Sequence, residues 1–257
     1  KMMLPITAVA ASLALVVSSG CGRGVDLDVS RTFQEAQETF DDAEAPEDFL
    51  RAAGLYQSIL EPGVVSGVVL YNQGNAYMRA GQRGRAIAAY RQAQRYRPRD
   101  PYLEANLLYA LGADVPTAGR RPAIEYLLFW QNRLSYPEKF WLAAAAAGMT
   151  FALGVAAVVW RRRLLTAWAL AGVALTLLLA FSAGYDWHRF DRTVHGVVVG
   201  EEVIARKGNA ESYEPAFTAP LGEGAEFRLT ERRGDWLLIR LWGGEEGWVR
   251  EEEVVVY

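Results

Sequence analysis

Two long apolar runs separated by three arginines constrain this chain more than any other feature of its sequence. Phe140 to Trp160 gives 21 residues without a charged side chain, and Leu164 to Tyr185 gives 22. An α-helix rises about 1.5 Å per residue, so each run can cross the roughly 30 Å of hydrocarbon in a bilayer. The sequence therefore predicts two transmembrane helices, 140–160 and 164–185, joined by a tight turn.

The turn between the two runs, Arg161–Arg163, predicts their orientation. Basic residues concentrate on the cytoplasmic side of membrane proteins, so the turn is expected inside and both flanking regions outside. Small residues recur every four positions in the first run, which predicts close packing against the second: Ala144, Gly148, Ala152 and Ala156. Neither run contains an acidic or basic residue, which argues against an ion pathway.

Composition argues against several classes of function. A net charge of −3 lacks the basic excess of a nucleic-acid-binding protein, so no nucleic-acid partner is expected. One cysteine permits neither an intramolecular disulfide nor a zinc site with several thiolates. His188 and His195 have no accompanying cysteine or serine motif. We therefore expect no catalytic residues, no metal site, no cofactor and no enzyme activity.

The N-terminal residues 1–21 have the pattern of an export signal. Lys1 is followed by an apolar stretch from Leu4 to Val17 and by small residues before Cys21. The arrangement resembles a bacterial lipoprotein signal, which implies lipidation of Cys21, although Ser18 departs from the usual aliphatic residue. An ordinary cleaved signal and an uncleaved anchor are the alternatives.

Residues 30–112 contain an internal repeat. Ala52, Tyr56 and Ile59 recur 34 residues later as Ala86, Tyr90 and Ala93, which is the period of a helix-turn-helix repeat. The second repeat, the run from Leu70 to Tyr77 followed by Gly81, Ala86, Tyr90, Ala93 and Pro98, resembles the tetratricopeptide signature. Its Gly74 and Ala86 let two helices approach closely, with Tyr77 and Tyr90 filling the space around them, and Gly81 suits the turn between them. Asp100 as N-cap and Pro101 at the first helical position predict one further, capping helix ending at Leu111.

Stacked helical hairpins form a concave surface that commonly binds an extended peptide or a protein terminus. Tyr71, Asn75 and Arg79 are spaced by four and share one helical face, and Asn106 on the next first helix adds an amide. These four residues are the predicted peptide-binding groove. The alternative is that Asn75 and Asn106 satisfy groups between helices.

Two further segments of this region have more than one interpretation. The second repeat is rich in arginine, which suits a partner or lipid surface but also an ordinary solvated face. Residues 122–136 are aromatic-rich and include Trp130 and Arg133, which predicts a helix in the membrane interface. Packing against the capping helix explains the same pattern.

Residues 194–257 change to a period of two with glycine turns, which predicts a small all-β domain. Val203–Gly208, the Arg232–Trp236 run and Gly247–Val249 resemble the bacterial SH3-like barrel, with Asn209 in place of a common proline. Such domains bind wall peptides or proteins, so Tyr213, Phe217 and Trp242 are candidate ligand contacts. Trp236 and Trp248 are expected in the barrel core.

The order of these parts resembles the BatE-like proteins of the bacterial aerotolerance (Bat) system. The fold class expected is a multidomain membrane protein with all-α tetratricopeptide hairpins, a two-helix transmembrane hairpin and an all-β SH3-like barrel. The resemblance implies a scaffold in the cytoplasmic (inner) membrane, with repeats and barrel on the periplasmic or extracytoplasmic side. Implied partners are von Willebrand factor A-type membrane proteins and a MoxR-type ATPase. The alternative is a peptidoglycan-binding anchor that acts through the SH3-like domain.

Overall fold

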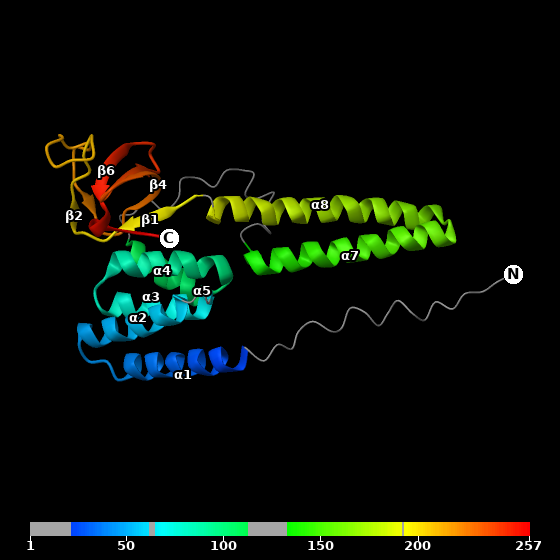
Figure 1. The fold of residues 1–257 in the computed structure, drawn as a ribbon, viewed down its shortest axis with the longest axis horizontal. Helices are drawn as coiled ribbons and strands as arrows, with labels where there is room; N and C mark the ends of the chain where they lie inside the picture. Colours follow the sequence, from blue (N-terminus) through cyan, green and yellow to red (C-terminus); the bar gives the residue numbers. More distant parts are fainter. Residues whose placement is uncertain (1–21, 62–64, 113–132, 192) are drawn as a thin grey trace.

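The computed structural model describes residues 22–61, 65–112, 133–191 and 193–257. Figure 1 shows three parts: a stack of helices, a long helical hairpin beside it, and a small β-structure that lies against the stack. The predicted signal 1–21, including Cys21, and most of the predicted interfacial helix 122–136 lie outside the described residues.

The described residues contain seven α-helices, two of them long and apolar. Five form the stack: α1 (Gly22–Asp41), α2 (Pro46–Leu60), α3 (Gly67–Arg79), α4 (Arg83–Tyr96) and α5 (Pro101–Leu111). The other two form the hairpin: α7 (Tyr136–Trp160) and α8 (Arg163–Asp191). Helix α1 begins eight residues before the predicted start of the repeat region at residue 30.

Local sequence signals explain where the helices of the stack begin and end. The Asp100 side chain accepts hydrogen bonds from the backbone N–H groups of Tyr102 (2.9 Å) and Leu103 (3.2 Å), which confirms the predicted N-cap of α5. Gly81 has φ +78° between α3 and α4, as predicted for this turn. Arg83 donates to the Ala110 and Leu111 carbonyls at 2.5 and 2.7 Å, satisfying the C-terminal end of α5.

Helices α3 and α4 approach closely at one glycine. A Cβ atom on Gly74 would lie 2.5 Å from the Tyr90 ring, so only glycine allows the ring to lie against the α3 backbone. Tyr90 is 1% exposed and belongs to the largest apolar cluster of the stack. This small-against-large contact is the one that the sequence predicted for Gly74.

Helices α7 and α8 are long and apolar enough to cross a membrane. Arg161, with φ +48°, closes the turn between them. A Cβ atom on Gly172 would lie 2.5 Å from Thr150 Oγ1, so the helices meet at these two residues. The prediction that the Ala144–Ala156 stripe packs on the second span is wrong. Ala144, Gly148 and Ala152 are exposed, because Thr150 lies on the other face of α7 and sets its rotation.

The C-terminal part is a small antiparallel structure of seven short strands among the described residues. They are β1 (His195–Val198), β2 (Glu202–Val203), β3 (Leu221–Gly222), β4 (Glu226–Arg233), β5 (Trp236–Leu241), β6 (Glu246–Arg250) and β7 (Val254–Val256). Five of them form one sheet in the order β6-β5-β4-β1-β7, and β2 pairs with β3.

Strand β1 is buried on both faces, because helix α4 covers the outer face of the sheet. Val198 points into the apolar core inside the β-structure, together with Phe227 and Ile239. Val197, its neighbour, belongs instead to the apolar cluster of the helical stack, together with Ile87 of α4. Successive residues of a strand point to opposite faces, so β1 joins two cores. We call this contact the helix–sheet interface.

Candidate functional site

Four polar side chains of α3, α4 and α5 meet in one cluster, which we call the amide cluster: Tyr71, Asn75, Tyr90 and Asn106. Asn106 Nδ2 donates to the Tyr71 hydroxyl at 3.1 Å and to Asn75 Oδ1 at 2.9 Å. The Tyr90 hydroxyl donates to the same Asn75 oxygen at 2.8 Å. The structure therefore brings together three of the four predicted groove residues and adds Tyr90.

Burial favours the neutral form of Tyr90 in the amide cluster. Desolvation raises the pKa of Tyr90 well above its usual value, so its hydroxyl remains a donor throughout the physiological range. Among the described residues, the bonds of the cluster use neither Nδ2 of Asn75 nor Oδ1 of Asn106. Both asparagines are half-buried rather than enclosed. One donor and one acceptor are thus left at the surface, the pair that a peptide backbone can satisfy.

Arg79, the fourth predicted groove residue, does not join this cluster. Its guanidinium lies over the Phe49 ring of α2, 4.9 Å from the centroid. The cation nearest the cluster is instead Arg97, which lies 5.3 Å from the Tyr71 ring centroid. Arg97 also forms an ion pair of 2.5 Å with Asp100, so its charge is already balanced. The site therefore suits a neutral peptide backbone better than a free carboxylate.

The arginines of the second repeat are engaged inside the molecule. Arg83 binds the end of α5, and Arg85 lies 5.9 Å from the Tyr77 ring centroid. Arg91 binds Glu226 of the sheet, and Arg99 binds Glu138 of α7. Each of these contacts joins α4, or the turn after it, to another element. These internal contacts account for several arginines of the basic run, while Arg85 and Arg99 stay exposed.

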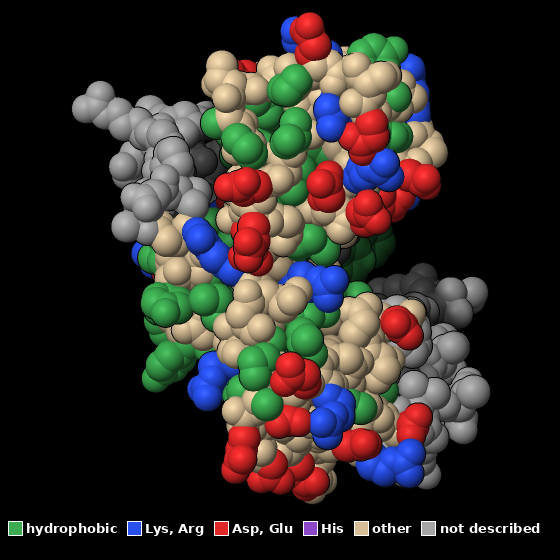
Figure 2. Space-filling view, turned by 90° about the vertical axis from the view of Figure 1, so that its left-hand side faces the viewer, with side chains coloured by type: hydrophobic (Ala, Val, Ile, Leu, Met, Phe, Trp, Pro, Cys, Tyr) green, Lys and Arg blue, Asp and Glu red, His purple; other side chains and the backbone are tan. Residues whose placement is uncertain are grey.

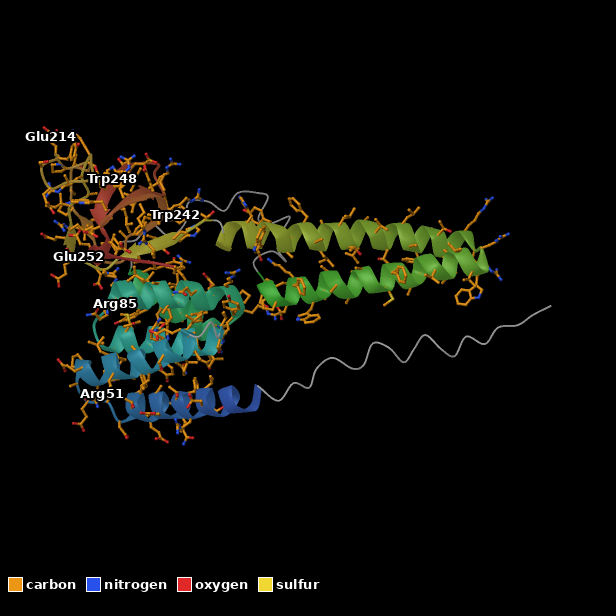
Figure 3. All side chains as sticks on the ribbon, viewed as in Figure 1. Arg51, Arg85, Glu214, Trp242, Trp248 and Glu252 are labelled. Carbon is orange, nitrogen blue, oxygen red and sulfur yellow. The ribbon has the colours of Figure 1, made fainter. Side chains whose placement is uncertain are left out.

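The three aromatic residues predicted as SH3-like ligand contacts do not form one site. Phe217 is half-buried and packs against the core of the β-structure. Tyr213 is 49% exposed and covers Gly208, where a Cβ atom would lie 2.6 Å from its ring. In Figure 3, Trp242 lies toward the helical hairpin, whereas Glu214, the neighbour of Tyr213, lies at the far side.

The two tryptophans expected in the core have different surroundings. Trp248 is buried, as expected, with the Arg233 guanidinium 5.3 Å from its ring centroid. Trp236 is only half-buried, and the Arg250 guanidinium lies 5.3 Å from its ring. Arg250 is held by Glu211 at 2.7 Å, which also pairs with Arg206 at 2.6 Å. The ion pairs of Glu211 with Arg206 and Arg250 therefore hold the loop that carries Tyr213.

No protein family, curated protein or solved structure matches this chain. The geometry of the candidate site is therefore the evidence for what it can bind. Figure 2 shows acidic side chains gathered over both the β-structure and the lower helices on the face opposite the hairpin. Among the described residues, no group of three or more histidine, cysteine or acidic side chains is placed to hold a metal ion.

Tyr90 and Arg97 are the site residues that sequence reasoning missed. Tyr90 was assigned to the space between helices, and its ring does fill that space while its hydroxyl reaches Asn75. Arg97 was counted only as part of a charged run. The signal for Tyr90 was available: a buried tyrosine normally finds a hydrogen-bond partner, and the nearest amide on the facing helix is the first candidate.

Proposed function

We propose that this chain is a non-catalytic scaffold of the bacterial envelope, anchored by α7 and α8 and binding an extended peptide segment of a partner protein. In this proposal α1–α5 are tetratricopeptide hairpins with a capping helix, and residues 194–257 are an SH3-like barrel. The 34-residue recurrence and the paired helices support the first assignment, and the antiparallel strand order is compatible with the second.

The amide cluster is the observation that carries this proposal. Asn75 lies on α3 and Asn106 on α5, and a hydrogen bond joins their side chains. This bond leaves Nδ2 of Asn75 as a donor and Oδ1 of Asn106 as an acceptor at a half-buried surface. A peptide bond presents the matching acceptor and donor. Backbone recognition of this kind selects an extended segment of a protein rather than a small molecule.

We further propose that the partners belong to the complex that the Bat resemblance implies. These are von Willebrand factor A-type membrane proteins and a MoxR-type ATPase system, linked to oxygen or stress tolerance. The proposed location is the inner membrane, with the helical stack and the barrel outside. Figure 1 supports a shared membrane side, because α1 begins on the side of the stack that faces the hairpin. Lipidation at Cys21 would then anchor both ends of the stack to one bilayer.

The test is crosslinked co-purification of the tagged full chain from native membranes, with proteins and wall fragments both identified by mass spectrometry. The variant Asn75→Ala/Asn106→Ala removes the free donor and acceptor and should lose the membrane-protein partners. Arg51→Ala is the matched control, because Arg51 is exposed on α2 and, within the part of the chain that the structure describes, its ion pair is with Asp48 of the same helix.

Recovery of von Willebrand-type proteins with the parent and the control, but not with the double variant, supports the proposal. Equal recovery with all three chains contradicts the assignment of the site. Recovery of peptidoglycan alone replaces the scaffold with a wall anchor, in which case Tyr213→Ala at the exposed end of the barrel should abolish sedimentation with the wall.

A further inference from the structure

We propose that the exposed part of the sheet's outer face, around Trp242, rests on the headgroup layer of the same bilayer that α7 and α8 span. The inference uses the membrane insertion in the proposed function but not its peptide-binding site. It concerns three residues of neighbouring strands and turns, which we call the Trp242 face: His195, Arg228 and Trp242.

The position of the Trp242 face follows from the chain path. Helix α8 ends at Asp191, and His195 begins β1 four residues later. Because an extended chain spans at most about 3.6 Å per residue, His195 lies within about 14 Å of the end of the helix. The Trp242 ring stacks on His195, with centroids 6.0 Å apart and planes 25° apart. In Figure 3, Trp242 accordingly lies on the side of the β-structure toward the hairpin.

The end of α8 has the composition of a membrane boundary. The apolar part of α8 ends at His188, and Tyr185 and Trp187 are exposed just before it. Tyrosine and tryptophan gather at the level of the lipid headgroups. The headgroup layer, about 5–7 Å thick on each side, therefore begins close to the helix end from which His195 follows.

The chemistry of the Trp242 face suits this layer. Trp242 is 67% exposed, a large apolar ring on an otherwise polar surface. Arg228 lies directly opposite His195 in the β1–β4 pair and is exposed. Among the described residues it has no ion pair, whereas its neighbour Arg240 is paired with Glu246. The Trp242 indole can therefore lie at the boundary of the acyl chains, and the Arg228 guanidinium can bind a lipid phosphate.

The Trp242 face cannot turn freely away from the membrane. Arg91 holds β4 to helix α4 through Glu226, and Arg99 holds the end of α4 to α7 through Glu138. These contacts, with the short link between α8 and β1, restrain the sheet relative to the hairpin. The orientation shown in Figure 3 is thus a property of the assembled chain.

The experiment uses the full chain, with Cys21→Ser, in phosphatidylcholine vesicles that contain a lipid with a nitroxide on its headgroup. A bimane fluorophore is attached at position 243 in a Gly243→Cys variant, which leaves the Trp242 indole intact. No atom lies within 4 Å of a Cβ placed on Gly243, so the substitution is tolerated. Glu214→Cys, at the far side of the β-structure, is the matched control.

Quenching at position 243 and none at 214 is the expected result, and it should decrease when Trp242→Ala is added. A probe at Leu177, midway along α8, reports insertion through quenching by nitroxides on the acyl chains. Quenching at 177 with equally weak quenching at 243 and 214 overturns this inference and leaves the membrane anchor in place. Absence of quenching at 177 overturns the anchor itself.

Discussion

Arg91 of α4 donates two hydrogen bonds to the Glu226 carboxylate of β4, from Nε at 2.6 Å and from Nη2 at 2.8 Å. The two residues are 135 positions apart in the chain and come from different parts of the molecule. Burial lowers the pKa of Arg91, but hydrogen bonds and attraction to Glu226 outweigh it and leave a net increase. The Arg91 guanidinium therefore keeps its charge and joins α4 to the sheet through Glu226.

Removing this pair should loosen the helix–sheet interface. Arg91→Ala leaves Glu226, whose side chain is 13% exposed, without its partner. Losing a hydrogen-bonded charge in such a place costs about 1.5–3 kcal/mol. We expect faster hydrogen exchange of the β1 and β7 amides in detergent micelles. A double-mutant cycle with Glu226→Ala should be strongly non-additive.

The control for this cycle is the Arg232–Glu251 pair, which lies within the β-structure at the surface. Its side chains are 49% and 44% exposed, and such pairs contribute about 0–1 kcal/mol. Arg232→Ala should leave the exchange of β1 nearly unchanged. If both variants change exchange equally, the Arg91 pair has no special role in joining helix to sheet.

A glycine at the same interface gives a second prediction. A Cβ atom on Gly84 would lie 2.5 Å from the carbonyl oxygen of Val198 and 3.1 Å from Val199 Cα, and neither backbone atom can move independently. The Gly84 N–H also donates to Glu223 at 2.7 Å. Gly84→Ala should therefore separate α4 from the sheet and lower the midpoint of thermal unfolding.

Gly54→Ala is the matched control for Gly84→Ala. Gly54 lies inside α2, and a Cβ atom there would have no atom within 4 Å. Alanine is favoured over glycine within a helix by about 1 kcal/mol, so this variant should be slightly stabilised. If the unfolding midpoint falls for Gly84→Ala and rises for Gly54→Ala, the interface and not helix propensity decides the stability of the Gly84 variant. A stabilising Gly84→Ala would contradict the close approach.

These interface residues show where sequence reasoning reached its limit. Local signals at Asp100, Gly81 and Gly74 specify caps, turns and helix pairs from neighbouring residues, and the structure has them as expected. Gly84 and Arg91 carry no local signal. Their roles depend on contacts with a sheet more than 100 residues away in the chain. The residue pattern of α4 does not predict which face of the helix that sheet covers.

The candidate site was predictable to a similar extent. A spacing of four correctly placed Tyr71 and Asn75 on one face and near Asn106. The same spacing failed for Arg79, because a long side chain can reach a neighbouring aromatic ring instead of the groove. The Ala144–Ala156 stripe failed for a related reason: small residues permit close packing on a face but do not require it, and Thr150 and Gly172 provided a closer contact.

The base of the apolar hairpin supports a third prediction. Lys139 of α7 and Asp186 of α8 form an ion pair, and their side chains are 0% and 8% exposed. Removing one partner of a buried pair costs about 3–5 kcal/mol, because the remaining buried charge loses the attraction of that partner. Lys139→Ala should therefore loosen the packing of the two helices, measured as lower crosslinking between cysteines introduced at Thr150 and Thr176, whose hydroxyl oxygens lie 3.3 Å apart.

The reversed pair distinguishes charge pairing from simple packing at this position. Lys139→Asp/Asp186→Lys retains one charge of each sign and should recover most of the crosslinking that Lys139→Asp alone loses. Failure of the reversed pair to recover it would mean that the shapes of the two side chains matter more than their charges.

Acid sensitivity of the first helical hairpin is the last prediction. The Asp48 carboxylate accepts hydrogen bonds from the backbone N–H groups of Ala45 (3.2 Å) and Glu44 (3.4 Å) ahead of α2. These bonds, and the charge of Arg51, lower the pKa of Asp48 below its usual 3.8. A carboxyl group whose pKa is lower in the folded state stabilises the fold above its unfolded pKa. That stabilisation is lost as the pH falls through the folded value.

Asp48→Asn should therefore destabilise α1 and α2 at neutral pH but not in strong acid. The difference in unfolding midpoint between parent and variant should be constant above about pH 5 and should shrink below the usual carboxyl pKa near 3.9. Glu47→Gln, the neighbouring substitution on the same turn, is the control, since Glu47 has no hydrogen bond or ion pair among the described residues. A difference that persists unchanged in strong acid would show that the amide changes packing and not the charged cap.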